Sequence, residues 1–526
     1  MVFLYLIKKR GLMSIAFELV PAYDLTQNIS DIFDRYSEEK AEILKIASFM
    51  KDAEATKYFI EGNGGAGISY AARELFKEEG AIRALNSRYW SEVVRLSGVL
   101  SYMTAKKRNE WSEQIREMTT PDFEMQLVLD TIENLLLSRE SFIAEKVEGI
   151  FNRLSRNHVT NSPMAFRERM IMSGVINSYD IICSNATEYI NDLRGIIAKV
   201  YDRDSSGVST YNDLYSIKAD KAFGEWHDFD GGAFKLRLYK VGTVHIEIHP
   251  EVANKLNRIL AFKYPGVIAT KEHEKELSKK IKYVPLRSVE VSGSTLSLVR
   301  TIAERWNNAK GEYFVFGEDS KSEEFIEIIK RLDGEYDGNY VKFDYNPVPA
   351  FKYIARTGCI PNKKDYQFYP TSEELADDMV NLLRIDYRSE VLEPSAGTGR
   401  LADAVKERYP HKAQITCVEI DQLNCEVLIG KGFKTLKHDF LEFKSKEGFD
   451  AVIMNPPFNK GQAQAHVIKA YSLLKKDGVI VACLPSSFRG KEIIPGVDHQ
   501  YSVIYEGAFE EEGTSVNVVI LKITKK

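Results

Sequence analysis

The chain has 526 residues, more than a single hydrophobic core normally serves, so its length predicts two or three domains. Hydrophobic residues make up 44% of it and charged residues 28%, fractions that are typical of a folded protein and argue against a disordered or fibrous one. The formal net charge of −5 argues against a surface that is basic throughout, so any contact with nucleic acid must come from a local patch.

The cysteines and the apolar runs indicate the cellular compartment in which the protein is expected. The five cysteines are scattered without a CxxC pair, so we expect neither a disulfide framework nor a metal site. The opening MVFLYLIKKRGLM has its basic residues after a short apolar run, the reverse of the order in a signal peptide. No other segment approaches about eighteen uninterrupted apolar residues. We therefore expect a cytoplasmic protein that does not contact a membrane.

The first two thirds of the chain show two patterns. From about residue 31 to 154 apolar residues recur at helical spacing, which predicts a mostly helical region. Residues 234–248 alternate apolar and polar side chains around a Val-Gly turn, which predicts a β-hairpin that leads into a helix. A second mixed portion runs from 284 to about 345. Residues 155–361 are thus expected to form an α+β region.

From residue 362 onward, segments typical of helices and of strands alternate. This alternation predicts a Rossmann-like α/β domain with an open, mostly parallel, doubly wound sheet, in which ligands bind at the carboxyl ends of the strands. The expected domains are the helical region, the α+β region and the α/β domain, at 1–154, 155–361 and 362–526. The expected helices lie at 372–385, 400–409 and 422–432, and the expected strands at 390–395, 413–421 and 450–457.

A loop of small residues, EPSAGTG, follows the first of these strands. Its glycines allow backbone amides to approach a ligand, and the next strand ends in Glu419, whose carboxylate can accept both ribose hydroxyls of a nucleoside cofactor. The third glycine of a dinucleotide motif is missing, and Glu393 suits an ammonium group. These features favour S-adenosyl-L-methionine as the cofactor. Its expected contacts here are Glu393, Pro394, Ser395, Ala396, Gly397, Gly399, Glu419 and Ile420.

The residues Asp439 and Phe440 follow the place where a third strand should end. The carboxylate can accept the amino hydrogens of the cofactor's adenine, and the aromatic ring can pack on the adenine face. We therefore add both residues to the expected cofactor contacts.

The NPPF motif, Asn455 to Phe458, carries the expected chemistry. An amine conjugated to a nucleobase is a poor nucleophile because its lone pair is delocalised into the ring. Two acceptors aligned on its hydrogens, the Asn455 side-chain oxygen and the Pro456 carbonyl, can draw the nitrogen toward a tetrahedral shape. Pro457 adds rigidity to the loop, and Phe458 offers a face on which a planar base can stack.

The order of these motifs resembles the gamma group of DNA amino-methyltransferases, over residues 362–526. EPSAGTG is similar to that family's first motif, VEID to its second, HDF to its third and NPPF to its catalytic motif, while FYPT resembles a cofactor-side motif. The resemblance implies N6-methylation of adenine in double-stranded DNA, by direct in-line transfer to a flipped base. It also implies that Tyr369, Pro370 and Thr371 contact the cofactor and that Phe509 lines the base pocket. Because the motifs are complete here, we expect this domain to bind the cofactor alone.

The stretches 145–166 and 234–250 resemble an uncharacterised domain of phage and mobile-element proteins, some of them fused to methyltransferases. That family has no known chemistry to transfer, so by position the region before residue 362, and the α+β region 155–361 in particular, is expected to recognise DNA or bind a partner. Two other patterns are interpreted as turns. Residues 62–67 fit GxGxxG but lie in a helical region, and 202–213 fit a calcium loop except at positions eight and twelve.

Two alternatives stay open. An NPP-aromatic motif serves several planar nitrogens, so an RNA base or a protein glutamine amide is the alternative substrate. The non-enzymatic alternative is a cofactor-type fold retained for DNA binding without turnover, against which the intact Asn455 and the loop glycines count. A Pro-Cys motif is missing at this site, which argues against cytosine-C5 methylation because that reaction needs a thiolate.

Overall fold

The computed structural model forms two compact units by its internal contacts. Unit 1 is Met1–Arg203, Phe223–Glu225 and Leu236–Ile281, and unit 2 is Asp204–Ala222, Trp226–Lys235 and Lys282–Lys526. Compact units need not coincide with functional domains, so the boundaries expected after residues 154 and 361 stay predictions. The structure describes residues 26–52, 58, 62, 76–154, 161, 165–201, 203, 208–263, 288–306, 311–315, 317–361, 370–410, 413–509 and 516–526.

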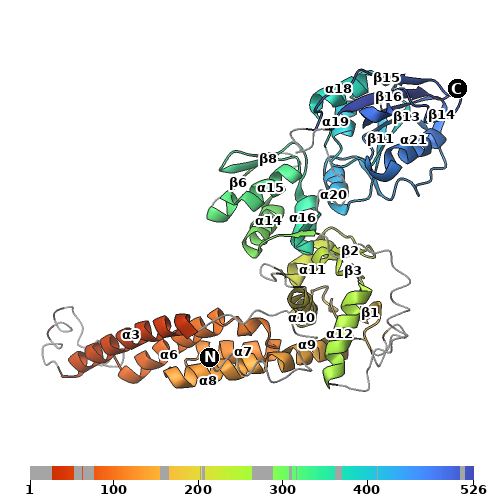
Figure 1. Cartoon of the computed structure of the whole chain (residues 1–526). Coiled ribbons are helices and arrows are strands. Elements are labelled where there is room, and N and C mark those ends of the chain that lie inside the picture. Colours follow the sequence, from red (N-terminus) through yellow and green to blue (C-terminus); the bar gives the residue numbers. More distant parts are fainter. Residues whose placement is uncertain are drawn as a thin grey trace. The chain divides into compact units, whose positions relative to one another are not determined.

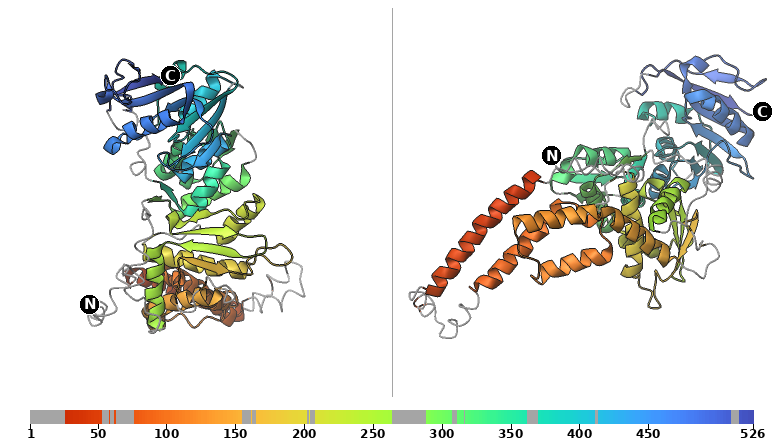
Figure 2. Two further views of the ribbon diagram at one scale, coloured as in Figure 1. Left: turned by 90° about the vertical axis from the view of Figure 1, so that its right-hand side faces the viewer. Right: turned by 60° about the horizontal axis from the view of Figure 1, so that its bottom comes forward.

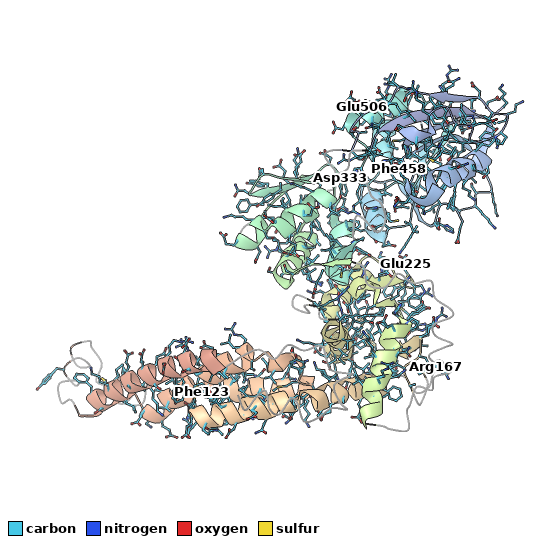
Figure 3. All side chains as sticks on the ribbon, in the orientation of Figure 1. Phe123, Arg167, Glu225, Asp333, Phe458 and Glu506 are labelled. Carbon is cyan, nitrogen blue, oxygen red and sulfur yellow. The ribbon has the colours of Figure 1, made fainter. Side chains whose placement is uncertain are left out.

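The first part of unit 1 is helical, as its apolar spacing predicts (Figure 1). Its core is aromatic: the buried ring of Phe123 lies 4.8 Å from that of Tyr36 and 5.6 Å from that of Tyr89. Figure 3 shows Phe123 among these helices. The elements are α3 (Thr26–Asp52), α6 (Glu78–Leu96), η1 (Val99–Ser101), α7 (Ala105–Arg116), α8 (Met125–Leu137) and α9 (Arg139–Arg153).

The predicted hairpin is confirmed. Strands β3 (Phe234–Leu238) and β4 (Val244–Ile248) each bury every second side chain, and helix α12 (Pro250–Lys263) follows. Gly242 makes the turn with a φ of 79°, and a Cβ at this position would collide with the carbonyl oxygen of Ile176. Strand β1 (Arg169–Met172) pairs antiparallel with β4, and α10 (Ser184–Val200) packs on α9.

Residues 288–361 of unit 2 contain both helices and strands and are called the mixed layer below. Their hydrophobic core includes Leu296, Phe325, Phe343 and Phe351. Strands β6, β8 and β7 make an antiparallel sheet in that order, and β5 pairs with β9. The elements are β5 (Ser288–Glu290), α14 (Gly293–Arg305), β6 (Gly311–Phe314), η3 (Glu318–Lys321), α15 (Glu323–Arg331), β7 (Glu335–Tyr336), β8 (Tyr340–Phe343), α16 (Val348–Thr357) and β9 (Cys359–Pro361). Unit 2 also contains α11 (Thr210–Ala219), β2 (His227–Phe229) and η2 (Asp230–Gly232).

The rest of unit 2 is built on a seven-stranded sheet in the order β12-β11-β10-β13-β14-β16-β15 (Figures 1 and 2). Strands β10 to β14 run parallel, and β16 and β15 add an antiparallel edge. The expected doubly wound α/β sheet is confirmed. The strands are β10 (Ser389–Pro394), β11 (Ala413–Glu419), β12 (Lys434–Lys437), β13 (Phe449–Met454), β14 (Leu474–Pro485), β15 (His499–Tyr501) and β16 (Val518–Thr524).

Helices cover both faces of this sheet. Val391 and Ile453 pack with α18 (Glu373–Asn381) and α19 (Arg400–Arg408), whereas Leu392 and Val452 pack with α21 (Gln462–Leu473) on the opposite face. The chain crosses from β12 at one edge to β13 on the other side of β10. In open α/β sheets, ligands bind beyond the strand ends at such a switch point, here between β10 and β13.

Helix α20 (Gln422–Gly430) connects the sheet to residues 288–361. Its Leu423 and Val427 are fully buried in the core of that mixed layer. The last residue of α20, Gly430, lies so close to the segment around Asn346 that a Cβ would collide with the carbonyl oxygen of Asn346. The two parts therefore share one core, which argues against the expectation that residues 362–526 suffice for cofactor binding.

The structure also bears on the expectations about membrane spans, metal ligands, cysteines and the stretches 62–67 and 202–213. Among the described residues no helix is long and apolar enough to cross a membrane, and no group of three His, Cys, Asp or Glu side chains is arranged to hold a metal ion. None of the five cysteines, all of which the structure describes, forms a disulfide, and all except Cys183 are buried. Most of the glycine-rich stretch 62–67 and much of the calcium-like stretch 202–213 lie outside the described residues.

Candidate active site

Four strand ends of the sheet meet at one cavity of about 620 Å³. The loops that follow β10, β11, β12 and β13 supply most of its wall, as expected at a switch point. Pockets of roughly 300–1,000 Å³ hold small molecules of cofactor size. The residues expected at the site that do line it are Pro370, Thr371, Glu393, Ser395, Ala396, Gly397, Glu419, Ile420, Asp439, Phe440, Asn455, Pro456, Pro457, Phe458 and Phe509.

Two expected residues of the described chain, Pro394 and Gly399, do not line the cavity. Tyr369 lies outside the described residues. Pro394 ends β10 behind the loop, and Gly399 precedes α19 with a φ of 85°. A Cβ on Gly399 would lie 2.5 Å from Leu428 Cδ2, so the glycine allows the loop to pack on α20. The expected contact of Gly399 with the cofactor stays a prediction, and its visible role is packing.

Two buried carboxyl groups flank the loop after β10. One oxygen of Glu419 accepts the Gly397 N–H at 2.7 Å, and the other accepts the N–H groups of Ile420 and Asp421 at 2.9 and 2.8 Å. Burial raises the pKa of Glu419 to about 7. A carboxylate has about four acceptor positions, so about one remains for a ligand hydroxyl. Acceptance of two ribose hydroxyls would require one backbone amide to give way.

Glu393 is the second buried acid. Its carboxylate accepts the Ala402 N–H at 2.8 Å, and burial, aided by the nearby charge of Asp403, raises its pKa well above the usual range. A buried acid in a cavity wall favours a bound cation, because a positive charge restores the carboxylate that burial disfavours. The site thus fits a ligand with an ammonium group.

The wall near β12 combines expected and unexpected residues. Phe440 is buried, and its ring centroid lies 5.4 Å from that of His466, a residue of α21 that sequence reasoning missed. His466 Nδ1 lies 2.9 Å from the Gln462 carbonyl oxygen, so Nδ1 carries hydrogen, and burial lowers the pKa of this imidazole. Asp439 is exposed, and its Oδ1 accepts the Leu441 N–H at 2.9 Å. A lone histidine in a helix carries no motif that would have identified His466.

The NPPF loop forms another part of the cavity wall. Asn455 Nδ2 donates to Thr371 Oγ1 at 3.2 Å, and Thr371 is buried. Pro456 is buried as well, so this loop is firmly held. The rings of Phe458 and Phe509 meet edge to face with centroids 6.1 Å apart, although 50 residues separate them in sequence. A hydrogen-bonded amide beside an aromatic pair can hold a planar group that carries an amine.

Comparison with known proteins identifies the domain that contains most of this cavity. Residues 376–507 match the family model of the methyltransferase small domain. This part of the chain is a methyltransferase domain. Its cofactor is S-adenosyl-L-methionine, as the acidic cavity and the loop after β10 favour. Residues 82–266 match a second model, described only as a domain of unknown function (DUF4942). No curated protein sequence matches the chain.

Several solved methyltransferase structures are similar to about a third of the chain. A putative RNA methyltransferase from Pyrococcus horikoshii is 24% identical over 31% of this chain and 90% of its own, with a TM-score of 0.26. A modification subunit of a putative type I restriction enzyme from Vibrio vulnificus is 17% identical over 30% and 44%, with a TM-score of 0.26. A dimethyladenosine transferase from Plasmodium falciparum is 17% identical over 30% and 64%, again with a TM-score of 0.26. Such likenesses do not identify a substrate.

The raised pKa of Glu419 predicts a pH dependence of cofactor affinity. The carboxylate form accepts hydroxyl hydrogens, and with a pKa of about 7 it is lost as the pH falls. The dissociation constant measured by calorimetry should therefore rise about tenfold between pH 8 and pH 6. Glu419→Gln should bind more weakly at pH 8 and show a smaller slope, whereas Glu393→Gln should keep the part of the slope that Glu419 contributes. A flat profile for the unmodified protein would place the ribose contact elsewhere.

Proposed function

We propose that the methyltransferase domain methylates the exocyclic amine N6 of adenine in double-stranded DNA. The observation that carries this proposal is the amide of Asn455, which donates from Nδ2 to the Thr371 hydroxyl at 3.2 Å. This contact decides which way the amide oxygen faces, and an acceptor of fixed direction is what an amine nucleophile requires. The aromatic pair Phe458 and Phe509 in the same wall favours a planar base over a small aliphatic amine.

The proposed mechanism assigns each of these residues one task. S-adenosyl-L-methionine supplies an electrophilic methyl group. The Asn455 oxygen and the Pro456 carbonyl accept the two amine hydrogens, so that the nitrogen lone pair turns from the ring toward the methyl group. The nitrogen would gain the methyl group as the cofactor's sulfur–methyl bond breaks to leave S-adenosyl-L-homocysteine, it would release one proton to solvent, and no covalent link to the protein would form. Phe458 holds the base by stacking.

DNA enters this proposal through base flipping. An enzyme cannot reach N6 of an adenine that is stacked in a duplex, so the nucleotide has to turn out into the cavity. We assign target selection to unit 1, because the stretches 145–166 and 234–250, which lie in it except for residues 234 and 235, resemble a domain that is sometimes fused to methyltransferases in phages and other mobile elements. The test of this assignment is site preference: variants in unit 1 should change which sites are methylated more than the rate of transfer.

The substrate is tested by offering all candidates together. Isotopically labelled cofactor is incubated with the full chain and with DNA, RNA or protein, and the labelled product is digested and identified. N6-methyladenine from DNA is the expected product. Label in RNA or in glutamine would support the alternative substrates, and absence of label from all three, with cofactor bound, would support a silent DNA-binding protein.

Phe458 separates base capture from chemistry. Loss of a stacking face costs about 1–3 kcal/mol per base, so Phe458→Ala should raise KM for DNA about tenfold or more while cofactor affinity is kept. Phe458→Tyr keeps the face and the contact with Phe509, and should act like the parent protein. Steady-state kinetics on adenine-containing DNA provide the measurement. An equal loss in both variants would contradict a stacking role.

A further inference from the structure

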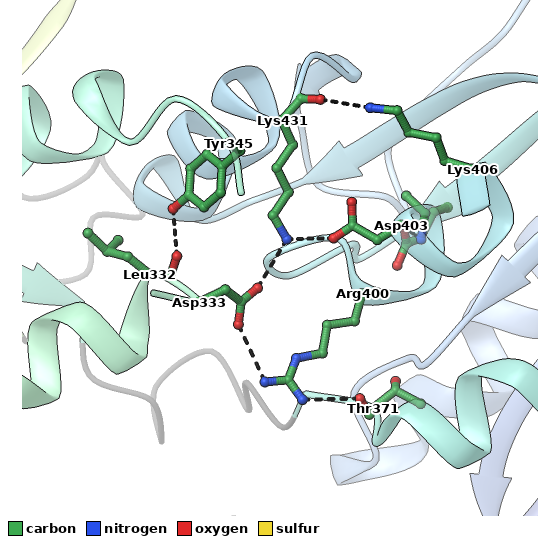
Figure 4. A network of polar contacts seen from close by, with 10 residues as sticks. Leu332, Asp333, Tyr345, Thr371, Arg400, Asp403, Lys406 and Lys431 are labelled. Carbon is green, nitrogen blue, oxygen red and sulfur yellow. Dashed lines mark hydrogen bonds and ion pairs between the residues drawn. The ribbon is translucent and has the colours of Figure 1, made fainter. Parts of the chain in front are cut away.

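Arg400, the first residue of α19, brings three parts of unit 2 together at the rim of the cavity. Its Nη1 donates to the Thr371 carbonyl oxygen at 3.4 Å, and its Nη2 lies 3.4 Å from Asp333 Oδ1 (Figure 4). Thr371 is the residue whose hydroxyl accepts from Asn455. Contacts thus run without a break from the Asp333 carboxylate through Arg400 and Thr371 to Asn455.

Asp333 comes from outside the matched methyltransferase region. It follows α15 within residues 288–361 with a left-handed φ of 56°, and its carboxylate contacts Arg400 and Lys431 of the α/β domain. Its second oxygen lies 3.1 Å from Lys431 Nζ, and Lys431 also reaches Asp403 at 2.6 Å. Burial alone would raise the pKa of Asp333, but Lys431 and Arg400 hold it below its usual value, so the group is charged.

The two partners of Asp333 differ in what they need. Lys431 keeps Asp403 as a partner if Asp333 is neutralised. Arg400 has a side chain 41% exposed, and Asp333 is the carboxylate with which it pairs. An exposed arginine samples many rotamers, and a charge-assisted contact selects among them. Neutralising Asp333 should therefore change the position of Arg400 at the cavity rim more than that of Lys431.

We propose that Asp333 is a positioning residue of the methyltransferase site, acting through Arg400 and Thr371 on the cofactor cavity and on the amide of Asn455. The mixed layer 288–361 is then a working part of the catalytic unit. The link to Asn455 rests on the proposed role of that residue in methyl transfer. The link to the cofactor cavity does not, because cofactor binding requires no methyl acceptor.

The test measures cofactor affinity by calorimetry and methyl transfer by single turnover, in the full chain. Asp333→Asn keeps the shape of the side chain and removes its charge. We expect it to weaken cofactor binding and to slow transfer, each about tenfold. Arg400→Gln should do the same, and Arg400→Lys should recover part of the affinity. The matched control is Glu335→Gln, which removes an exposed ion pair with Lys342 at 3.1 Å only two residues along the chain, and should change neither quantity.

A double-mutant cycle distinguishes positioning from general stabilisation. If Asp333 acts through Arg400, Asp333→Asn should have little further effect on cofactor affinity once Arg400→Gln is present. Additive losses would overturn the proposal, as would a lower melting temperature in Asp333→Asn with unchanged affinity and rate. If Asp333→Asn does not fold, Arg400→Gln and Arg400→Lys decide by themselves, because a cofactor affinity unchanged in both would overturn it. If DNA proves not to be the substrate, the calorimetric titration of the cofactor still tests the role of Asp333, because it requires no methyl acceptor.

Discussion

Asn455→Ala is expected to slow single-turnover methyl transfer about a hundredfold or more and to leave cofactor affinity nearly unchanged. The lost acceptor matters most as the amine nitrogen becomes tetrahedral, so the substitution removes about 3–4 kcal/mol of transition-state stabilisation. The variant also leaves the Thr371 hydroxyl without the contact that it makes at 3.2 Å. The measurement is the rate of label transfer to DNA with enzyme in excess, beside a calorimetric titration of the cofactor.

The companion substitutions make this result specific. Asn455→Asp should be less damaging than alanine, because a carboxylate still accepts and the Thr371 hydroxyl can donate to it. Thr371→Val should slow transfer as well, because it removes the contact that directs the amide. If Asn455→Ala kept the parent rate, the acceptor role of this residue would be refuted.

A chain reduced to residues 362–526 is expected to lose cofactor binding, in contrast to the expectation from its motifs. Without residues 288–361, Leu423 and Val427 of α20 become exposed. Exposing two such side chains costs about 3–6 kcal/mol, a large share of the roughly 5–15 kcal/mol by which a domain is stable. Helix α20 begins at Gln422, three positions after Glu419, so its loss would disturb the cofactor cavity first.

The matched comparison is a chain that contains all of unit 2, with residues 204–235, which include residues 223–225 of unit 1, joined to 282–526 by a flexible glycine-serine linker. This chain keeps the mixed layer and α11, whose Asp213 pairs with Arg300 at 2.8 Å. It should bind the cofactor with the affinity of the full chain, as measured by calorimetry, and melt cooperatively. Equal binding by the 362–526 chain would show that the shared core is dispensable.

The features of the site that the sequence could predict are those determined by residues close together in the chain. The loop after β10, the acids Glu393 and Glu419 and the NPPF loop are each set by a strand and the few residues after it, and all three line the cavity. The topology of α/β sheets then brings successive strand ends together without further information. The hairpin at residues 234–248 was equally local, because alternation and a glycine turn decide it.

Contacts between distant segments could not be predicted in this way. Thr371 and Asn455 are 84 positions apart, and Asp333 and Arg400 are 67 apart, so no spacing rule joins them. Gly399 shows a related limit. The sequence indicates that a glycine is needed there, but Leu428, which lies where a Cβ would go, belongs to a later helix. For the same reason, the sequence does not predict that α20 packs into the core of residues 288–361. The motifs of a domain indicate its ligand site and not the surface by which it packs on a neighbouring segment.

The close fit of Gly430 against Asn346 has a consequence for how such a chain can be recombined. A catalytic domain exchanged between relatives at residue 362 would bring an α20 whose last turn has not been matched to the segment around Asn346, and any side chain larger than glycine would collide there. A crossover near residue 282 would transfer both surfaces together. Chimeras joined at these two positions should therefore differ in yield of folded protein, and natural exchange is expected to favour the earlier breakpoint.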